Sequence, residues 1–143
     1  MSNLVDLEKK INSELTTKIN TSKINHSQIF INIDSEDLID VILFLKNNEN
    51  TKFRQLIDIT AVDYPQKDKR FKLVYMFLSH EYNSRLVLEC LINEDEIVPT
   101  ITKIYPASNW MEREVFDMYG IKFKDHPDLR RILTDYGFEG FPL

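Results

Sequence analysis

The sequence predicts an α+β fold in which helices pack on one face of an antiparallel sheet meander. Apolar residues recur at helical spacing up to residue 48 and again after residue 99, whereas residues 53–92 form short alternating stretches between polar turns. The 143-residue chain contains no internal repeat and no linker-like stretch. We therefore expect a single domain over residues 1–143.

The first 48 residues predict a helix, a strand and a second helix. Apolar residues at steps of three and four predict a helix over residues 4–19. Its stripe consists of Leu4, Leu7, Ile11, Leu15 and Ile19. The polar stretch 20–27 then leads to a short strand with alternating isoleucines at 29, 31 and 33. Asp34 is placed to cap the second helix, and Asn47 and Asn48 to end it, since Asn tolerates the left-handed conformation.

The middle of the chain predicts three strands. The first begins at Phe53 and closes at Tyr64-Pro65, with strict alternation that puts Phe53, Ile57 and Ile59 on one side. Residues 71–79 are apolar on both faces after Leu73, which predicts a central position in the sheet. Residues 85–92 follow a short turn, so we expect them to pair back as an antiparallel hairpin.

The last third predicts two helices. A short helix begins at Pro99, carries Ile101, Ile104 and Tyr105, and ends at Pro106. Asn109 caps the next helix, with Glu112 at the reciprocal capping position and Gly120 as its end. We expect its buried face to be Met111, Val115, Met118 and Tyr119. An extended piece over residues 121–124, a turn over 125–127 and a charged segment over 128–135 follow.

Composition excludes several classes of function. The net charge of -5 argues against nucleic acid or an anionic membrane surface as the main partner. The longest apolar run, residues 73–78, is far shorter than the roughly 20 residues of a membrane helix. The single cysteine, Cys90, allows no intrachain disulfide and no thiolate-held cluster, and its strand pattern predicts a buried hydrophobe rather than a reactive thiol. The N-terminus does not resemble a secretory signal, which predicts a reducing compartment.

Two polar groups of residues leave alternatives open. Asp125, His126 and Asp128 could bind a divalent cation in a metal-dependent enzyme, although we favour a turn fixed by Pro127. Three of the six arginines lie between residues 113 and 131, beside several acids. They suggest an ion-pair lattice, in which Arg113 pairs with Asp117 at i, i+4; the alternative is a solvated helix face.

Several stretches carry a resemblance to a known family. From Glu112 to Pro142 the chain reads Glu-Arg-Glu-Val-Phe-Asp-Met-Tyr-Gly-Ile-Lys-Phe-Lys-Asp-His-Pro-Asp-Leu-Arg-Arg-Ile-Leu-Thr-Asp-Tyr-Gly-Phe-Glu-Gly-Phe-Pro. Upstream stand Leu56-Ile-Asp-Ile-Thr-Ala-Val-Asp-Tyr-Pro65, Tyr82-Asn-Ser-Arg85 and Ala107-Ser-Asn-Trp-Met-Glu-Arg-Glu114. Together they resemble the C-type subunit of respiratory NADH:quinone oxidoreductase (complex I) over roughly residues 53–143, and the first fifty residues resemble it in layout alone.

The resemblance implies a non-catalytic peripheral-arm subunit that scaffolds the quinone-reducing module. It implies no cofactor or metal on this chain, while the assembled complex uses NADH, FMN, iron–sulfur clusters and quinone. The implied partners are other peripheral-arm subunits, chiefly the quinone-pocket subunit, on the cytoplasmic side of a bacterial inner membrane or the mitochondrial matrix side, with membrane contact only through the complex. The motif's charged positions imply a structural and interfacial role for Glu112, Arg113, Glu114, Asp117, Asp128, Arg130, Arg131 and Asp135.

The resemblance leaves an alternative assembly and one departure. The same fold could serve a related membrane-bound hydrogenase or another quinone-reducing complex, because a scaffold motif does not fix the electron donor. Family members usually continue past the Pro-Leu at residues 142–143 into a basic tripeptide and a tail. We therefore expect either a fragment or a chain whose docking through that tail is absent or supplied by another polypeptide.

Overall fold

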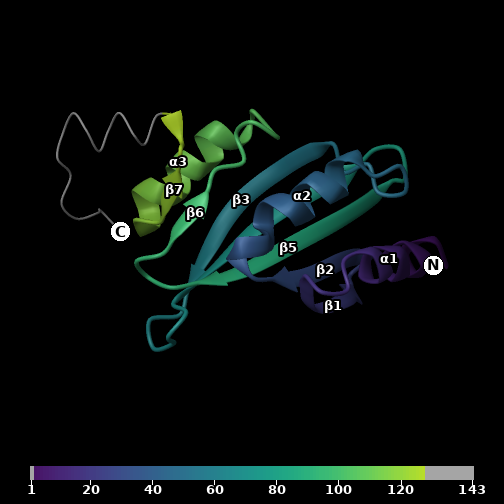
Figure 1. Cartoon of the computed structure of the whole chain (residues 1–143), viewed down its shortest axis with the longest axis horizontal. Helices are drawn as coiled ribbons and strands as arrows, with labels where there is room; N and C mark the ends of the chain where they lie inside the picture. The colour runs from purple at the N-terminus through teal and green to yellow at the C-terminus, as the bar shows by residue number, and fades with distance from the viewer. Residues whose placement is uncertain (1, 128–143) are drawn as a thin grey trace.

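The computed structural model describes residues 2–127, and its centre is a five-stranded sheet with the strand order β1-β2-β5-β4-β3 (Figure 1). Its strands are β1 (Ile19–Asn25), β2 (Gln28–Ile33), β3 (Gln55–Asp63), β4 (Phe71–Ser79) and β5 (Ser84–Ile92). A smaller sheet pairs β6 (Ile97–Pro99) with β7 (Lys122–Lys124). The helices are α1 (Ser2–Glu14), α2 (Leu38–Asn47) and α3 (Ser108–Tyr119), and a 3-10 turn (Ser35–Asp37) precedes α2.

The direction of each strand follows from how the chain returns to the sheet. β4 lies between β3 and β5 and pairs antiparallel with both, which confirms the predicted central strand and its hairpin. β2 pairs with β5 in parallel. The crossover through α2 sets β3 parallel to β2, and two hairpin reversals then bring β5 into the same direction. The fold is therefore the predicted α+β arrangement with one parallel pair inside a mostly antiparallel sheet.

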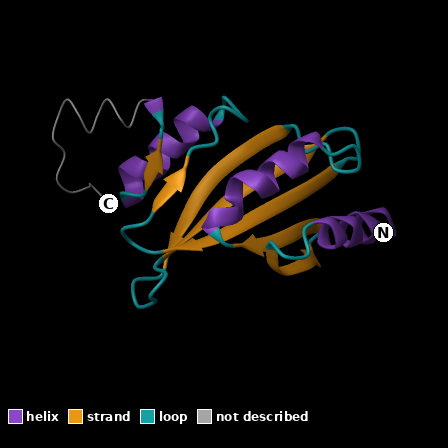
Figure 2. Cartoon of the chain, viewed as in Figure 1, coloured by secondary structure: helices purple, strands orange, loops and turns teal. Residues whose placement is uncertain are grey.

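Helices cover one face of the larger sheet, as predicted. Figure 2 shows α2 lying over the larger sheet, with its axis running roughly along the strands. The Phe71 ring meets the Tyr119 ring of α3 at 6.0 Å between centroids, and the Phe77 ring meets Tyr105 at 5.4 Å. Phe71 and Phe77 are separated by an even number of residues along β4, so their side chains lie on the same face. α3 and the turns before it therefore pack on the same side of that strand. The core lies between this face and the helices.

The sequence analysis places no strand in the polar stretch 20–27, but β1 forms over Ile19–Asn25. The first helix ends at Glu14 rather than residue 19, and Ile19 begins β1. β1 and β2 form an antiparallel hairpin whose turn residues, His26 and Ser27, have φ values of 51° and 62°. Positive φ at both central residues matches the twist of a two-residue hairpin. Backbone pairing, rather than an apolar pattern, makes this polar stretch a strand.

The predicted strict alternation from Phe53 is also wrong. The register of β3 against β4 shifts between Leu56 and Asp58, which marks a β-bulge. The extra residue turns Ile57 outward, where its side chain is 36% exposed, while Leu56 and Ile59 are both buried.

The predicted helix from Pro99 does not form. Residues 97–99 pair with β7 as a short parallel strand, and residues 101–105 continue in turns. Ile101 and Tyr105 are buried nonetheless, and the Tyr105 hydroxyl donates a hydrogen bond to the Phe53 carbonyl. A long-range strand partner therefore overrides the local preference of Pro99 for a helix start.

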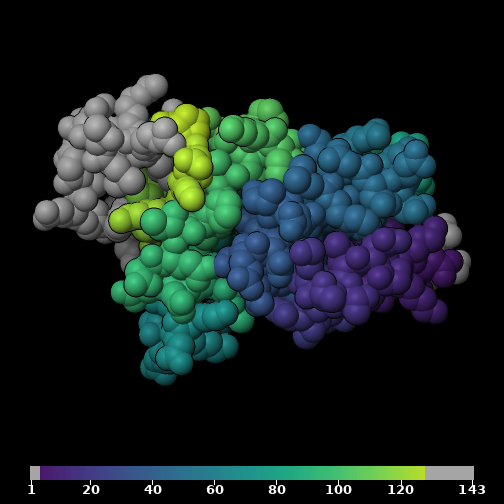
Figure 3. All heavy atoms as spheres, viewed as in Figure 1, coloured from purple at the N-terminus to yellow at the C-terminus, as the bar shows by residue number. Residues whose placement is uncertain are grey.

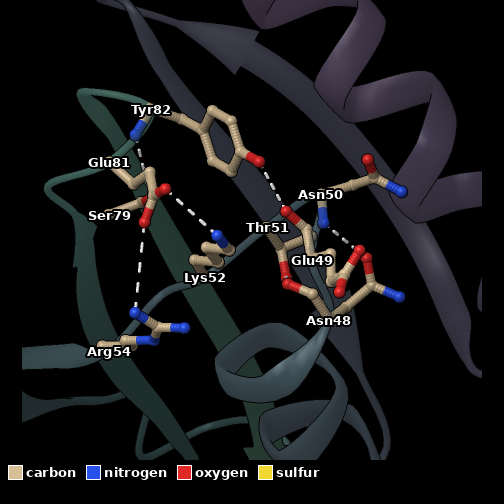
Figure 4. Close-up of polar contacts among 9 residues, drawn as sticks. All are labelled: Asn48, Glu49, Asn50, Thr51, Lys52, Arg54, Ser79, Glu81 and Tyr82. Atoms are coloured by element: carbon tan, nitrogen blue, oxygen red, sulfur yellow. Dashed lines mark hydrogen bonds and ion pairs between the residues drawn. The ribbon is translucent and has the colours of Figure 1, made fainter.

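The turns after α2 and between β4 and β5 meet at one end of the sheet, and we call residues 48–54 and 79–82 the turn cluster (Figure 4). The Tyr82 hydroxyl donates to the Glu49 carbonyl (2.5 Å), and Lys52 Nζ lies 3.1 Å from Glu81 Oε1. α2 ends at Asn47 as predicted, but Asn48 is extended (φ -68°) and Lys52 takes the left-handed conformation (φ 48°). Asp34 forms no side-chain capping bond, because the 3-10 turn intervenes before α2.

Candidate interface on helix α3

Helix α3 carries most of the described residues that the sequence selects. It ends at Gly120, whose φ of 75° is the left-handed conformation that glycine adopts readily, and Gly120 N donates to the Phe116 carbonyl at 2.8 Å. The predicted helix end is therefore confirmed. The predicted Asn109 cap is wrong: the helix begins at Ser108, and Ala107 occupies the capping position.

Glu112 lies in the core rather than at a capping position. Its side chain is fully buried, accepts a hydrogen bond from Thr100 Oγ1 (2.5 Å) and accepts another from Ile101 N (2.9 Å). Burial raises the pKa of Glu112 to about 7, although both hydrogen bonds act in the opposite direction. The carboxyl group thus joins α3 to the segment that follows β6.

His126 joins the same buried side of α3 to the turn after β7. Its side chain is fully buried, and Nε2 lies 2.9 Å from the Asn109 carbonyl oxygen and 3.8 Å from Glu112 Oε1. Because a carbonyl oxygen only accepts, Nε2 carries a proton and donates to it. Asp125 has a φ of 66° in the predicted turn. In the alternative of a metal site at Asp125, His126 and Asp128, the Nε2 atom of His126 is therefore already bonded to the backbone. Asp128 lies outside the described residues.

Four side chains form the outer face of α3: Trp110, Glu114, Asp117 and Met118. Their spacing of four, seven and eight residues places them on one side of the helix. Trp110 is 63% exposed and Met118 is 57% exposed, so the prediction that Met118 is buried is wrong. The Trp110 indole Nε1–H donates to Glu114 Oε1 at 2.5 Å. The exposed Trp110 is the residue that sequence reasoning missed, since its isolated position gave no apolar pattern.

The predicted site residues therefore fall into three places. Glu112 is in the core, Glu114 and Asp117 are exposed, and Arg113 is half-buried. Within residues 2–127, Arg113 and Asp117 form no ion pair with each other. The remaining predicted residues lie outside the described residues: Asp128, Arg130, Arg131 and Asp135.

Other polar candidates have structural partners. Asp34, Glu36 and Asp37 place carboxylates close together before α2, but Lys18 lies 3.5 Å from Asp37 and Asn20 donates to Asp34. Cys90 is buried in β5, which confirms the predicted buried position. Burial also raises the pKa of its thiol to about 12. In the described part of the chain, each helix is too short or too polar to cross a bilayer.

Comparison with known sequences identifies the relatives of this chain. A model of the family described as respiratory-chain NADH dehydrogenase, 30 Kd subunit, matches residues 31–143. The C-type subunit of the NADH-quinone oxidoreductase of Ruegeria pomeroyi is 51% identical over 120 residues, which cover 84% of this chain and 60% of that protein. The corresponding subunit of a Chelativorans species is 41% identical over 140 residues, or 98% of this chain and 70% of that protein.

This chain spans about 60% of the Ruegeria pomeroyi protein and 57% of a second relative, the C-type subunit of Dinoroseobacter shibae. Among solved structures, a chain of an archaeal respiratory membrane complex, the membrane-bound sulfane sulfur reductase, superposes with a TM-score of 0.72. The alignment covers 94% of this chain and 92% of that chain at 20% identity, so it shows a shared fold. The match over residues 31–143, together with these relatives, establishes that the chain belongs to the family of the 30 Kd subunit of the respiratory-chain NADH dehydrogenase.

Proposed function

We propose that this chain is a non-catalytic peripheral-arm subunit of a proton-translocating NADH:quinone oxidoreductase. The observation that carries the proposal is the family match over residues 31–143, with relatives named as the C-type subunit of that enzyme. In this role the chain scaffolds the quinone-reducing module and contacts chiefly the quinone-pocket subunit. It meets the membrane only through the complex, on the cytoplasmic side of a bacterial inner membrane or on the matrix side of a mitochondrial one.

The proposal assigns the redox cofactors to other subunits. NADH, FMN, iron–sulfur clusters and quinone belong to the assembled complex. A single cysteine cannot hold an iron–sulfur cluster through four thiolates, and Cys90 is buried in the sheet besides. Glu112 and His126 meet as a buried pair that joins α3 to the smaller sheet, which supports a structural role for this part of the motif.

The test is the size and activity of the assembly that contains this chain. The chain is tagged at residue 1, because α1 lies at the end of the molecule opposite α3 (Figure 1). Mildly solubilised membranes are then separated on a native gel and stained in-gel for NADH dehydrogenase activity. We expect the tag in a very large, active band. A tag found only in a small species contradicts assembly of this chain into the complex. NADH oxidation by the purified chain contradicts a non-catalytic role.

A second candidate is the equivalent scaffold of another respiratory complex, such as a membrane-bound hydrogenase. The shared fold with the sulfane sulfur reductase chain favours it at the level of architecture. The same gel discriminates the two. A large tagged band without NADH dehydrogenase activity, containing a nickel-site hydrogenase subunit by mass spectrometry, supports this candidate over the first.

A further inference from the structure

We propose that Trp110 and Met118 are the side chains by which this chain anchors to a neighbouring subunit. The partner surface that fits them is an apolar pocket bordered by a cationic side chain. This inference rests on the proposed function, since it assumes a multi-subunit assembly, and it goes further by naming the docking face and the chemistry of its partner.

The two anchors lie outside the hydrophobic core of this chain. One side of α3 is buried in this chain, and its buried residues are Ser108, Glu112, Val115 and Phe116. Trp110 and Met118 lie on the other side, where they are 63% and 57% exposed. They are the two most exposed large apolar side chains within the described range. Trp and Met are enriched where protein surfaces meet, and a buried Trp is a frequent centre of binding energy.

The indole of Trp110 already has its hydrogen-bond partner. Nε1–H donates to Glu114 Oε1 on the same helix at 2.5 Å. An indole that enters a pocket must keep a partner for its N–H, or the unsatisfied donor weakens binding. Because Glu114 belongs to the same helix and stays bonded to Trp110, the pocket that receives the ring needs no acceptor for the indole N–H. The bond also fixes the ring before binding, which reduces the ordering cost of docking.

Charge decides which kind of surface fits this face. Glu114 and Asp117 lie between the two anchors, and neither forms an ion pair with any residue in the described range. A neighbouring Arg or Lys beside the pocket would pair with them. A second copy of this chain is the poorer occupant, because a two-fold contact through α3 would bring these acids against their own copies.

The exposed fractions of Trp110 and Met118 make this face accessible, and α3 lies at one end of the molecule. Figure 3 shows the surface of α3 and β7, in green to yellow, at the end opposite α1. The turn cluster lies away from it (Figure 1), and its Tyr82 side chain is 45% exposed. Tyr82 therefore offers a matched control: an exposed aromatic residue outside the proposed contact.

The test replaces the cell's own copy with a tagged full-length chain and measures the fraction of tag in the large native band. We expect Trp110→Ala to lower this fraction more than tenfold and Met118→Ala several-fold, whereas Tyr82→Ala leaves it within twofold. Trp110→Phe should stay within threefold of the unchanged chain, since the partner uses the ring and not its N–H. Urea unfolding of the purified variants shows whether each one is folded, so that loss of assembly is not mistaken for loss of structure.

The charge component has its own readout. Glu114→Gln retains an acceptor for the indole but removes the charge, and Asp117→Asn removes the second charge. We expect the double variant to assemble with a weaker dependence on ionic strength than the unchanged chain.

The outcomes separate this inference from the function on which it rests. If the unchanged chain enters the large band and Trp110→Ala enters it equally, the anchor is wrong and the proposed function stands. If the unchanged chain does not enter a large band, the proposed function is wrong. If the purified chain instead forms a dimer that the Trp110→Ala variant does not form, that result overturns the choice of partner in favour of a second copy.

Discussion

The turn cluster and the outer face of α3 differ in how their exposed charged side chains are paired. In the turn cluster, Tyr82 donates to Glu49, Lys52 pairs with Glu81, and the Thr51 hydroxyl donates to the Leu45 carbonyl at the end of α2 (2.7 Å). On α3, the polar bond between Trp110 and Glu114 leaves a large ring facing solvent. The polar groups of the first region pair with one another, whereas the second is the face that we propose as a docking surface. Exposure alone does not separate the two regions, and both aromatic side chains bond a group of this chain. What differs is the pairing of charges: Lys52 pairs with Glu81, whereas Glu114 and Asp117 form no ion pair within the described residues.

A substitution on the inner side of α3 should lower the free energy of unfolding more than any in the turn cluster or on the outer face. Glu112→Ala removes the acceptor of Ile101 N and Thr100 Oγ1 and leaves a cavity in the core. We expect the free energy of unfolding to fall by roughly 3–5 kcal/mol. Glu81→Ala in the turn cluster should cost less than about 1 kcal/mol, because its ion pairs are exposed. Urea denaturation of both variants checks this; equal losses would mean that burial does not distinguish the two ends.

Stability should also depend on pH through Glu112. Burial raises its pKa from the ordinary 4.5 to about 7, so between these values the folded chain holds a proton that the unfolded chain has released. The contribution is fully present below about pH 4.5 and is lost as the pH rises through about 7, with an amplitude of roughly 3 kcal/mol. Glu112→Gln should remove this fall. Urea unfolding at about pH 5 and about pH 8 measures it, and an unchanged slope in the variant would refute the assignment.

A smaller effect is expected where the turn cluster meets α2. Thr51 is fully buried and its hydroxyl satisfies the carbonyl of Leu45. Thr51→Val keeps the shape but removes the donor, so we expect a loss of about 1–2 kcal/mol. Thr60→Val in β3, which changes the same groups at a half-buried strand position, is the matched control and should cost little. Thermal unfolding of the pair decides whether the hydroxyl bond matters.

Arg113 should give the smallest effect. An ion-pair lattice around it would make Arg113→Ala cost about 3–5 kcal/mol, whereas a solvated position costs less than about 1 kcal/mol. Arg113 is half-buried and forms no ion pair with any side chain of residues 4–127, so we expect the smaller value. Chemical denaturation of the full chain measures the loss, and a loss above roughly 3 kcal/mol would restore the lattice.

The errors of sequence-based prediction have physical causes at particular residues. Apolar alternation located β2, β4 and β5, because their side chains themselves meet the core. It missed β1, which is held by backbone pairing along a polar edge and by a turn of non-glycine residues with positive φ. Along α3, the buried side includes the ionisable Glu112, which a hydrophobicity pattern cannot place inside. The expected stripe was therefore rotated toward Met118, and the outer face went unrecognised.

The parallel pairing of β2 with β5 has a consequence for how the chain is made. β2 is synthesised before α2, β3 and β4, yet its inner edge pairs with β5, which leaves the ribosome after all of them. One edge of the β1–β2 hairpin therefore stays unpaired until β5, the last strand of the larger sheet, has been synthesised. During that interval the open edge is the part of the nascent chain most exposed to aggregation, and protection by a chaperone would be needed longest there.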